Sequence, residues 1–176
     1  MNETTWGVIA TWRMAHDGVK KASQLLQANG TAGDAVEALI KTVEAYPYYK
    51  SVGYGGLPNE NGEVEMDAAF MDGDTLAQGA VAGIHQVLHA VSVARALSHD
   101  HYNSFLVGQG ATQYAQLNGF EMRNMLTDRA KNVGKSAGQN LLTPKSNLTM
   151  AMTQWAPLRW HQQDQWPQRP QHQAYL

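Results

Sequence analysis

The sequence predicts an α/β domain in which helices are layered on a sheet. Short apolar or β-branched segments at 6–12, 63–71, 78–82 and 105–107 are typical of strands. Longer segments with apolar residues at helical spacing lie between them. A stretch dense in glycine and asparagine, 51–73, separates the N-terminal helices from the later strands.

Composition limits the classes of function. With 176 residues, of which 43% are hydrophobic, the chain is long enough for one domain with a packed core. A net charge of −2 indicates no nucleic-acid or membrane partner, and the absence of cysteine fits a reducing compartment. No signal peptide or membrane-spanning run is recognisable, so we expect a soluble, cytoplasmic protein.

The N-terminal segment predicts a strand followed by a helix. Residues 6–12 are apolar and partly β-branched, which is typical of a buried strand. Asp17 is the expected N-cap of a helix of about twelve residues. Asn29 and Gly30 are expected to end it, with Gly30 as the left-handed residue.

A second helix is expected from Thr31 onward. Thr31 and Asp34 resemble a capping box, and Pro47 cannot continue a helix. The predicted buried stripe consists of Ala35, Val36, Leu39, Ile40 and Val43.

The 51–73 stretch predicts a glycine bend, a hairpin turn at Asn61-Gly62 and a strand. From Glu63 to Ala68, polar and apolar residues alternate with period two, which indicates a half-buried strand. A second turn is expected at Asp72-Gly73.

The following segment predicts a strand at 78–82 and a helix over 84–98. A short strand at 105–107 and a helix at 108–117 complete this part. Gly108-Gln109-Gly110 is only half of a dinucleotide fingerprint, so it is interpreted as strand-to-helix packing. These elements form a first region, 1–120.

The region 121–176 has a different composition. Residues 121–150 are polar, and 154–175 are rich in glutamine and proline and contain three tryptophans. We interpret this region as a linker or tail.

Gly73-Asp74-Thr75 is the first candidate for chemistry. A threonine with a free α-amino group can act as both nucleophile and base. Turns between strands also attract these residue types, and the turn is the favoured interpretation.

His85 and His89 are four residues apart in the expected helix, a spacing that could hold a metal. No third ligand is evident, so an exposed helix face is favoured and no metal is expected. Asp67 and Asp72 could be paired carboxylates, but solvated or capping roles are favoured. By composition, Trp12 is more typical of a core than of a substrate site.

Several motifs follow one another along 6–120. They are T-W at 11–12, G-x-x-x-D-A-V-E at 30–37, S-V-G-Y-G-G-L-P-N-E-N-G-E-V-E-M-D-A-A-F-M-D-G at 51–73, G-A-V-A-G at 79–83, A-R at 94–95 and L-V-G-Q-G-A at 106–111. In this order they resemble the α-subunit portion of one family of N-terminal-nucleophile hydrolases, the glycosylasparaginase and type 2 L-asparaginase (isoaspartyl peptidase) family.

The resemblance implies a four-layer αββα sandwich that is incomplete without a β-subunit half. It implies an amidohydrolase that cleaves the side-chain amide of asparagine or of N4-substituted or β-aspartyl derivatives and releases aspartate, without a cofactor. Self-cleavage in His-Asp-Thr or Gly-Asp-Thr exposes the nucleophilic threonine, which is expected after Leu176, so no catalytic residue is assigned here.

Two residues acquire roles through the resemblance. Trp12 is expected to border the substrate pocket, and Ser51 is expected to support the processing site. The implied partners are a β-subunit with an N-terminal threonine, an (αβ)2 assembly and a small asparagine-type substrate. The alternatives are a catalytically inactive truncated remnant or binding module and, more weakly, metal-dependent hydrolysis through His85 and His89.

Overall fold

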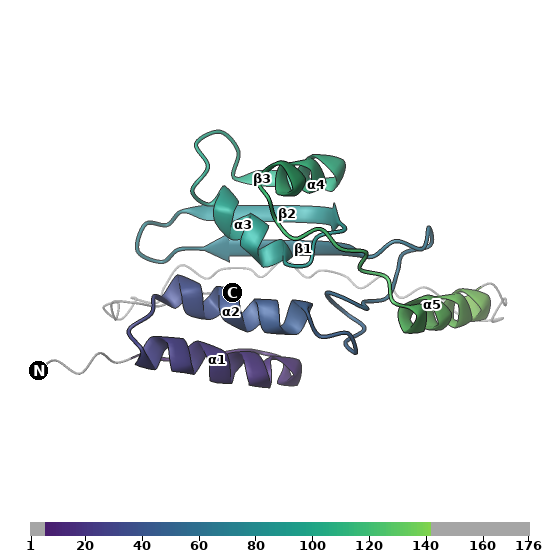
Figure 1. Cartoon of the computed structure of the whole chain (residues 1–176), viewed down its shortest axis with the longest axis horizontal. Coiled ribbons are helices and arrows are strands. Elements are labelled where there is room, and N and C mark those ends of the chain that lie inside the picture. The colour runs from purple at the N-terminus through teal and green to yellow at the C-terminus, as the bar shows by residue number, and fades with distance from the viewer. Residues whose placement is uncertain (1–5, 142–176) are drawn as a thin grey trace, which may run out of the picture.

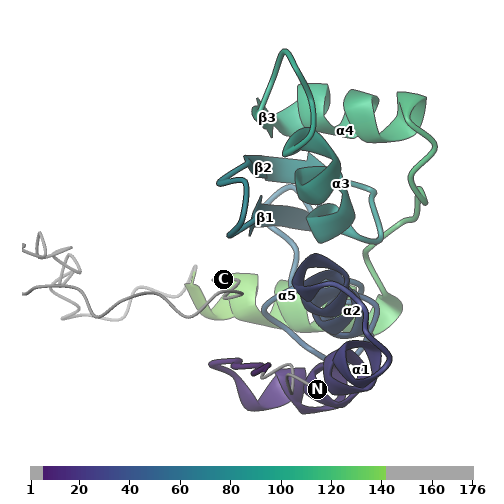
Figure 2. The ribbon, with the colours of Figure 1, turned by 90° about the vertical axis from the view of Figure 1, so that its left-hand side faces the viewer.

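The computed structural model describes residues 6–141, with side chains up to residue 135. A helical hairpin lies along one edge of a small sheet, and two further helices cover one side of that sheet (Figures 1 and 2). The elements are η1 (Arg13–Ala15), α1 (His16–Gln27), α2 (Ala32–Glu44), β1 (Glu65–Met71), β2 (Gln78–His85), α3 (Ala90–Leu97), β3 (Phe105–Val107), α4 (Gly108–Leu117) and α5 (Asp128–Leu141).

The described sheet has the order β1-β2-β3. β1 and β2 are antiparallel and are joined by a turn, whereas β3 runs parallel to β2 after α3. A bulge interrupts the β1–β2 register between Met66 and Ala68, and there the Asp67 carboxylate accepts the Gly83 N–H at 2.7 Å. The side chain thus replaces a ladder bond that the bulge removes.

Two apolar clusters hold these elements together. The larger one joins the sheet to α3 and α4, and the smaller one joins α1 to α2. The fully buried side chains of the larger cluster include Val81, Ile84, Val87, Val93 and Leu97.

α3 approaches β2 closely at Gly79. A Cβ atom at this position would collide with the backbone of Ala94 and of Ser98. Glycine therefore allows the helix to lie directly on the strand.

Gly79→Ala is expected to destabilise the fold by about 2 to 3 kcal/mol, because α3 would have to move away from the sheet. Gly110→Ala is the matched control, since a Cβ there meets no atom within 4 Å and alanine favours the α4 helix. Urea unfolding of both variants tests this prediction, and equal midpoints would contradict it.

The opposite side of the sheet is open in the part of the chain that the structure describes. Phe105 and Val107 are 58% and 57% exposed, and Ala80 lies between Ala69 and Phe105 in register. Figure 2 shows α3 and α4 on the other side only. We call this surface the open sheet face: Ala69, Met71, Ala80, Ala82, Phe105 and Val107.

Four predicted elements are confirmed. The Thr31 hydroxyl accepts the Asp34 N–H at 3.1 Å and caps α2, as expected. β1, β3 and α4 also lie where the sequence indicated.

The predicted strand at 6–12 is wrong. This segment is irregular as far as Ala10 and then bends into η1, and no described strand pairs with it. Val8 and Ala10 pack on the α1–α2 cluster, but Ile9 is 87% exposed. A strand requires a partner for its backbone groups, and the described sheet offers none here.

The end of α1 differs in detail from the prediction. Asn29, not Gly30, adopts the left-handed conformation, with φ of 62°. The Gly30 N–H donates to the Leu25 carbonyl at 2.8 Å, which completes a Schellman motif. At the other end, Asp17 lies inside the first turn, and Ala15 is the N-cap.

The helix predicted over 84–98 is too long. β2 continues to His85, because Ile84 pairs with Met66 and His85 with Glu65, and α3 begins only at Ala90. α5 is an addition, since no element was assigned within 121–150. The predicted tail at 154–175 lies outside the described residues. No described helix is long and apolar enough to cross a membrane.

Candidate functional site

Trp12 and Ser51 lie on two segments that the fold brings together. The Tyr49 hydroxyl donates to the Met14 carbonyl at 3.1 Å, and Tyr49 and Val52 pack on the α1–α2 cluster. Both Trp12 and Ser51 are exposed, and Trp12 is 64% exposed at the N-terminus of η1. The assignment of Trp12 to the core is therefore wrong, while the pocket and processing roles stay predictions.

The glycine bend that follows Ser51 is held from two sides. The Tyr54 N–H donates to the Glu44 carbonyl at 2.7 Å, and the Gly55 N–H donates to the Met125 carbonyl at 2.8 Å. Gly53 has φ of 75°, and a Cβ there would collide with the Glu44 backbone. Glycine is required because the end of α2 leaves no room for a side chain.

Glu44 is the one buried charged side chain in the part of the chain whose side chains are described, with 2% exposure. Its carboxylate accepts the Val91 N–H at 3.1 Å and lies 3.3 Å from His89 Nδ1. Both partners are at the N-terminus of α3, where backbone N–H groups lack helical partners and favour a negative charge. Glu44 was not predicted from the sequence, although Glu37 and Glu44 are spaced seven apart beside the α2 stripe.

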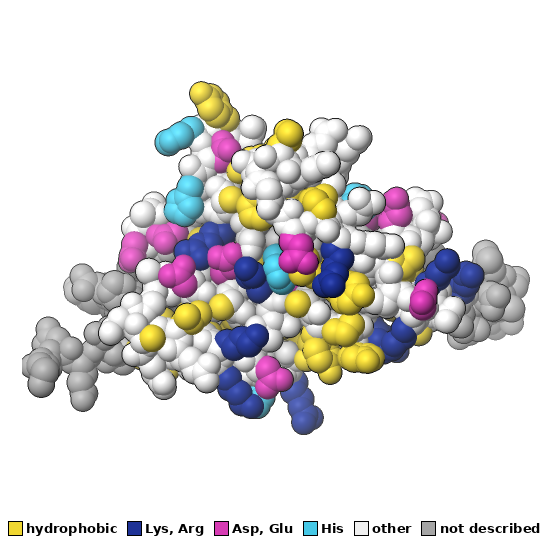
Figure 3. Space-filling view, viewed as in Figure 1, with side chains coloured by type: hydrophobic (Ala, Val, Ile, Leu, Met, Phe, Trp, Pro, Cys, Tyr) yellow, Lys and Arg dark blue, Asp and Glu magenta, His cyan; other side chains and the backbone are white. Residues whose placement is uncertain are grey.

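A charged cluster clamps α2 to α3 along the same interface. Arg95 donates to Glu37 at 2.6 Å and to Asp34 at 2.7 Å, and Ser92 also donates to Glu37. Asp34, Glu37 and Arg95 line a groove of about 630 Å³, and charged side chains gather over α2 and α3 in Figure 3. The two acids and the arginine satisfy one another, while the side chains of Lys21 and Lys41 also line the groove.

The clamp shifts the pKa of each ionisable member. Thr31 and then Arg95 lower the pKa of Asp34. Burial raises the pKa of Glu37, but bonds from Ser92 and Arg95 outweigh this and lower it overall. Burial likewise opposes the charge on Arg95, but Glu37 and Asp34 raise its pKa.

These shifts predict that the fold loses stability in acid. Carboxyls with depressed folded-state pKa values stabilise the fold above their ordinary values, about 4, and this contribution disappears as pH falls through the folded values. Urea midpoints measured from pH 7 to pH 3 are expected to fall less in Arg95→Met than in the wild type. If the urea midpoints of the two proteins fell in parallel with pH, the charged cluster around Arg95 would not be the cause of the acid sensitivity.

Gly73-Asp74-Thr75 forms the turn between β1 and β2. The Asp72 carboxylate accepts the Thr75 N–H and hydroxyl, both at 2.8 Å, and the Asp74 N–H at 3.1 Å. The bonds from Thr75 and then from Asp74 lower the pKa of Asp72. The Thr75 nitrogen is a hydrogen-bonded amide within this turn, which confirms the turn that was the favoured interpretation.

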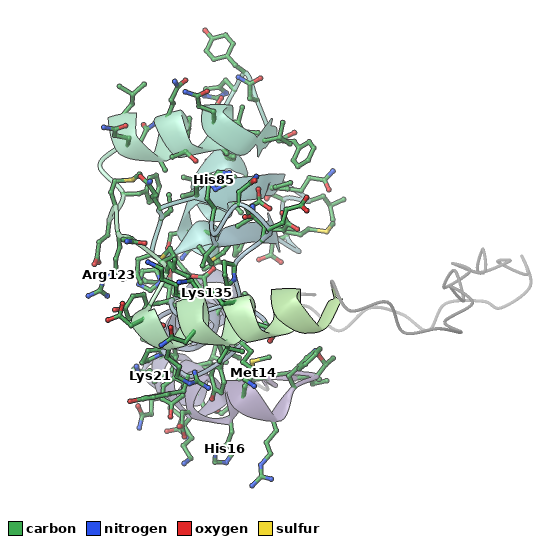
Figure 4. The ribbon with its side chains drawn as sticks, turned by 90° about the vertical axis from the view of Figure 1, so that its right-hand side faces the viewer. Met14, His16, Lys21, His85, Arg123 and Lys135 are labelled. Atoms are coloured by element: carbon green, nitrogen blue, oxygen red, sulfur yellow. The ribbon has the colours of Figure 1, made fainter. Side chains whose placement is uncertain are left out.

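The two histidines do not share a helix face. His85 is on β2 beside Glu63 and Glu65, whereas His89 precedes α3 and faces Glu44. In Figure 4, His85 lies among the strands, on the other side of α5 from Met14 and His16. The described residues contain no group of three or more His, Asp or Glu that could hold a metal. Asp67 and Asp72 are also separate, one at the bulge and the other in the turn.

A second cavity, of about 530 Å³, lies between the N-terminal segment, the start of α2 and the β1–β2 turn. Apolar side chains such as Trp6, Ile9, Leu39 and Phe70 line it. Neither Trp12 nor Ser51 is among its lining residues, so it is not the pocket assigned to Trp12.

Comparisons with known proteins identify the family. A family model described as Asparaginase matches residues 4–165. An N(4)-(beta-N-acetylglucosaminyl)-L-asparaginase from Elizabethkingia miricola is 38% identical over 120 residues, which are 68% of this chain and 35% of that protein. An isoaspartyl peptidase/L-asparaginase from Mus musculus is 34% identical over 125 residues, 67% of this chain and 38% of the other.

A plant-type L-asparaginase from Pyrococcus horikoshii is 42% identical over 113 residues, 64% of this chain and 37% of that protein. These similarities define a protein of the asparaginase type. The chain belongs to the family whose members include glycosylasparaginases and isoaspartyl peptidase/L-asparaginases, which confirms the resemblance. It spans a little over a third of the length of the three relatives.

Proposed function

We propose that this chain is the α-subunit portion of an amidohydrolase that releases aspartate from asparagine or from N4-substituted or β-aspartyl derivatives. The observation that carries the proposal is the family match over 4–165, which includes both the glycine bend and Trp12. The nucleophilic threonine belongs to a β-chain that is not part of these residues.

The reaction follows from a threonine with a free amino group. Its amine takes the hydroxyl proton as the oxygen attacks the side-chain carbonyl carbon of the substrate. The C–N bond breaks, the leaving amine takes the proton, and a β-aspartyl ester remains. Water then hydrolyses the ester and releases aspartate.

The open sheet face supports the four-layer arrangement. A row of exposed and half-buried alanines, together with the exposed Phe105 and Val107, is suited to packing against a second sheet rather than to solvent. We propose that the β-chain supplies this second sheet, that two such pairs form an (αβ)2 assembly, and that the enzyme is cytoplasmic.

In this arrangement Trp12 forms one wall of the substrate pocket. Its exposed ring, on a segment tied to the one that carries Ser51, is available to contact a substrate at the β-chain threonine.

The assay follows aspartate release by the complete αβ protein from asparagine, N4-(N-acetylglucosaminyl)asparagine and a β-aspartyl dipeptide. Release from at least one is expected, and it should survive EDTA and both His85→Ala and His89→Ala. Binding of these compounds without release would instead favour a binding module. Activity lost with EDTA would favour the metal-dependent alternative.

Trp12→Ala is expected to raise KM about tenfold, because the lost contact is made with the bound substrate as well as with the transition state. Trp12→Phe keeps an aromatic wall and should stay within about threefold of the wild type. Tyr102→Ala is the control, since Tyr102 is exposed in the loop before β3. An unchanged KM in Trp12→Ala would remove Trp12 from the pocket.

A further inference from the structure

Glu44 has two sets of partners, one for its side chain and one for its backbone. The carboxylate is directed at α3, and the carbonyl is directed at the glycine bend. These contacts connect the last turn of α2 to two segments that are distant in the sequence.

The side-chain contacts fix the end of α2 against the start of α3. Val91 N–H is one of the donors that an α-helix leaves without an intrahelical partner, and α3 has no side-chain cap at its N-cap residue, His89. The Glu44 carboxylate supplies the missing acceptor and a negative charge at the positive end of α3. No described buried side-chain N or O atom lacks a partner, so this junction is fully satisfied.

The backbone contacts fix the bend against the same turn. The Glu44 carbonyl accepts the Tyr54 N–H, and Gly53 lies against the Glu44 backbone with no space for a Cβ. A small displacement of Glu44 therefore displaces the bend, and Ser51 is only two residues from Gly53.

We infer that Glu44 is a positioning residue: its buried carboxylate holds the end of α2 in the place that sets the conformation of the 51–56 bend and hence the position of Ser51. This inference rests on the proposed function only in what Ser51 does, because the contacts themselves are independent of that function. Glu37 provides a matched comparison, since it is on the same helix and also bonds to α3 but makes no hydrogen bond to the bend.

The first test is amide hydrogen exchange of the 176-residue chain, followed in peptides that cover 50–57. Glu44→Ala is expected to accelerate exchange there at least about tenfold, and Glu37→Ala less than about threefold. Unchanged exchange in Glu44→Ala, or equal acceleration in both variants, would overturn the inference.

Conservative variants separate positioning from general destabilisation. Glu44→Gln keeps an acceptor for Val91 N–H and is expected to protect the bend to within about threefold of the wild type. Glu44→Asp keeps the charge, but its side chain is too short to reach Val91 N–H. It replaces Glu44→Ala in the comparison with Glu37→Ala if Glu44→Ala fails to fold. If exchange at 50–57 is as fast in Glu44→Gln as in Glu44→Asp, the proposed geometric role of Glu44 is wrong.

Gly53→Ala disturbs the same contact from the other side. It is expected to accelerate exchange at 50–57 while Val91 stays protected, because the α2–α3 junction is not touched. If Gly53→Ala accelerated exchange at Val91 as well as at 50–57, the inferred order, in which the α2–α3 junction positions the bend, would be contradicted.

The second test uses the complete gene product and measures self-cleavage. Glu44→Ala is expected to slow it at least about tenfold, and Glu44→Gln is expected to restore most of the rate. Cleavage unaffected by Glu44→Ala would overturn the link to processing. Absence of cleavage in the wild type would instead reject the proposed function, and the exchange comparison would still decide the role of Glu44.

Discussion

Ala80→Arg is expected to abolish assembly with the β-chain and to reduce aspartate release at least about 100-fold. Ala80 lies in the middle of the open sheet face, between Ala69 and Phe105. In the proposed sandwich an arginine there would be buried without a partner, which costs about 3 to 5 kcal/mol. Size-exclusion chromatography and the aspartate assay measure the two effects.

The control is Gln113→Arg, which adds the same charge to an exposed position on α4, in the outer layer. This variant should assemble and act like the wild type. Equal activity of the two variants would mean that the open sheet face is not covered by a second sheet.

Arg95→Met is expected to reduce the free energy of unfolding by about 2 kcal/mol, because it leaves two acids without their cation. The effect stays below that of a fully buried pair, since Asp34 and Arg95 keep contact with solvent. A double-mutant cycle with Glu37→Gln and urea unfolding measures the pairwise part. A coupling energy near zero would show that the α2–α3 clamp does not stabilise the fold.

Elements with local signals could be predicted from the sequence. Thr31 with Asp34 marks the start of α2, and the alternation after Glu63 marks β1, because capping and period-two burial depend on neighbouring residues. Other elements depend on distant partners. The segment 84–88, I-H-Q-V-L, fits either a helix or a strand by its pattern. The pairing of Ile84 with Met66 and of His85 with Glu65 makes it a strand as far as His85.

The site was less predictable than the fold for the same reason. Trp12 is typical of a core by residue type, yet the segment that carries it has no described strand to pair with and leaves the ring exposed. Glutamate is a residue type typical of the surface, and Glu44 is buried because the N-terminus of α3 packs against it. The turn at Thr75 was predicted correctly, because its hydrogen bonds join neighbouring residues.

The most direct test of the account is to express the complete gene product and to sequence every N-terminus by mass spectrometry while aspartate release is measured. The account predicts a second chain that begins with threonine directly after an aspartate, and activity that appears together with this chain and is lost when that threonine is changed to alanine. Full activity in an uncleaved product, or in the threonine-to-alanine variant, would contradict it.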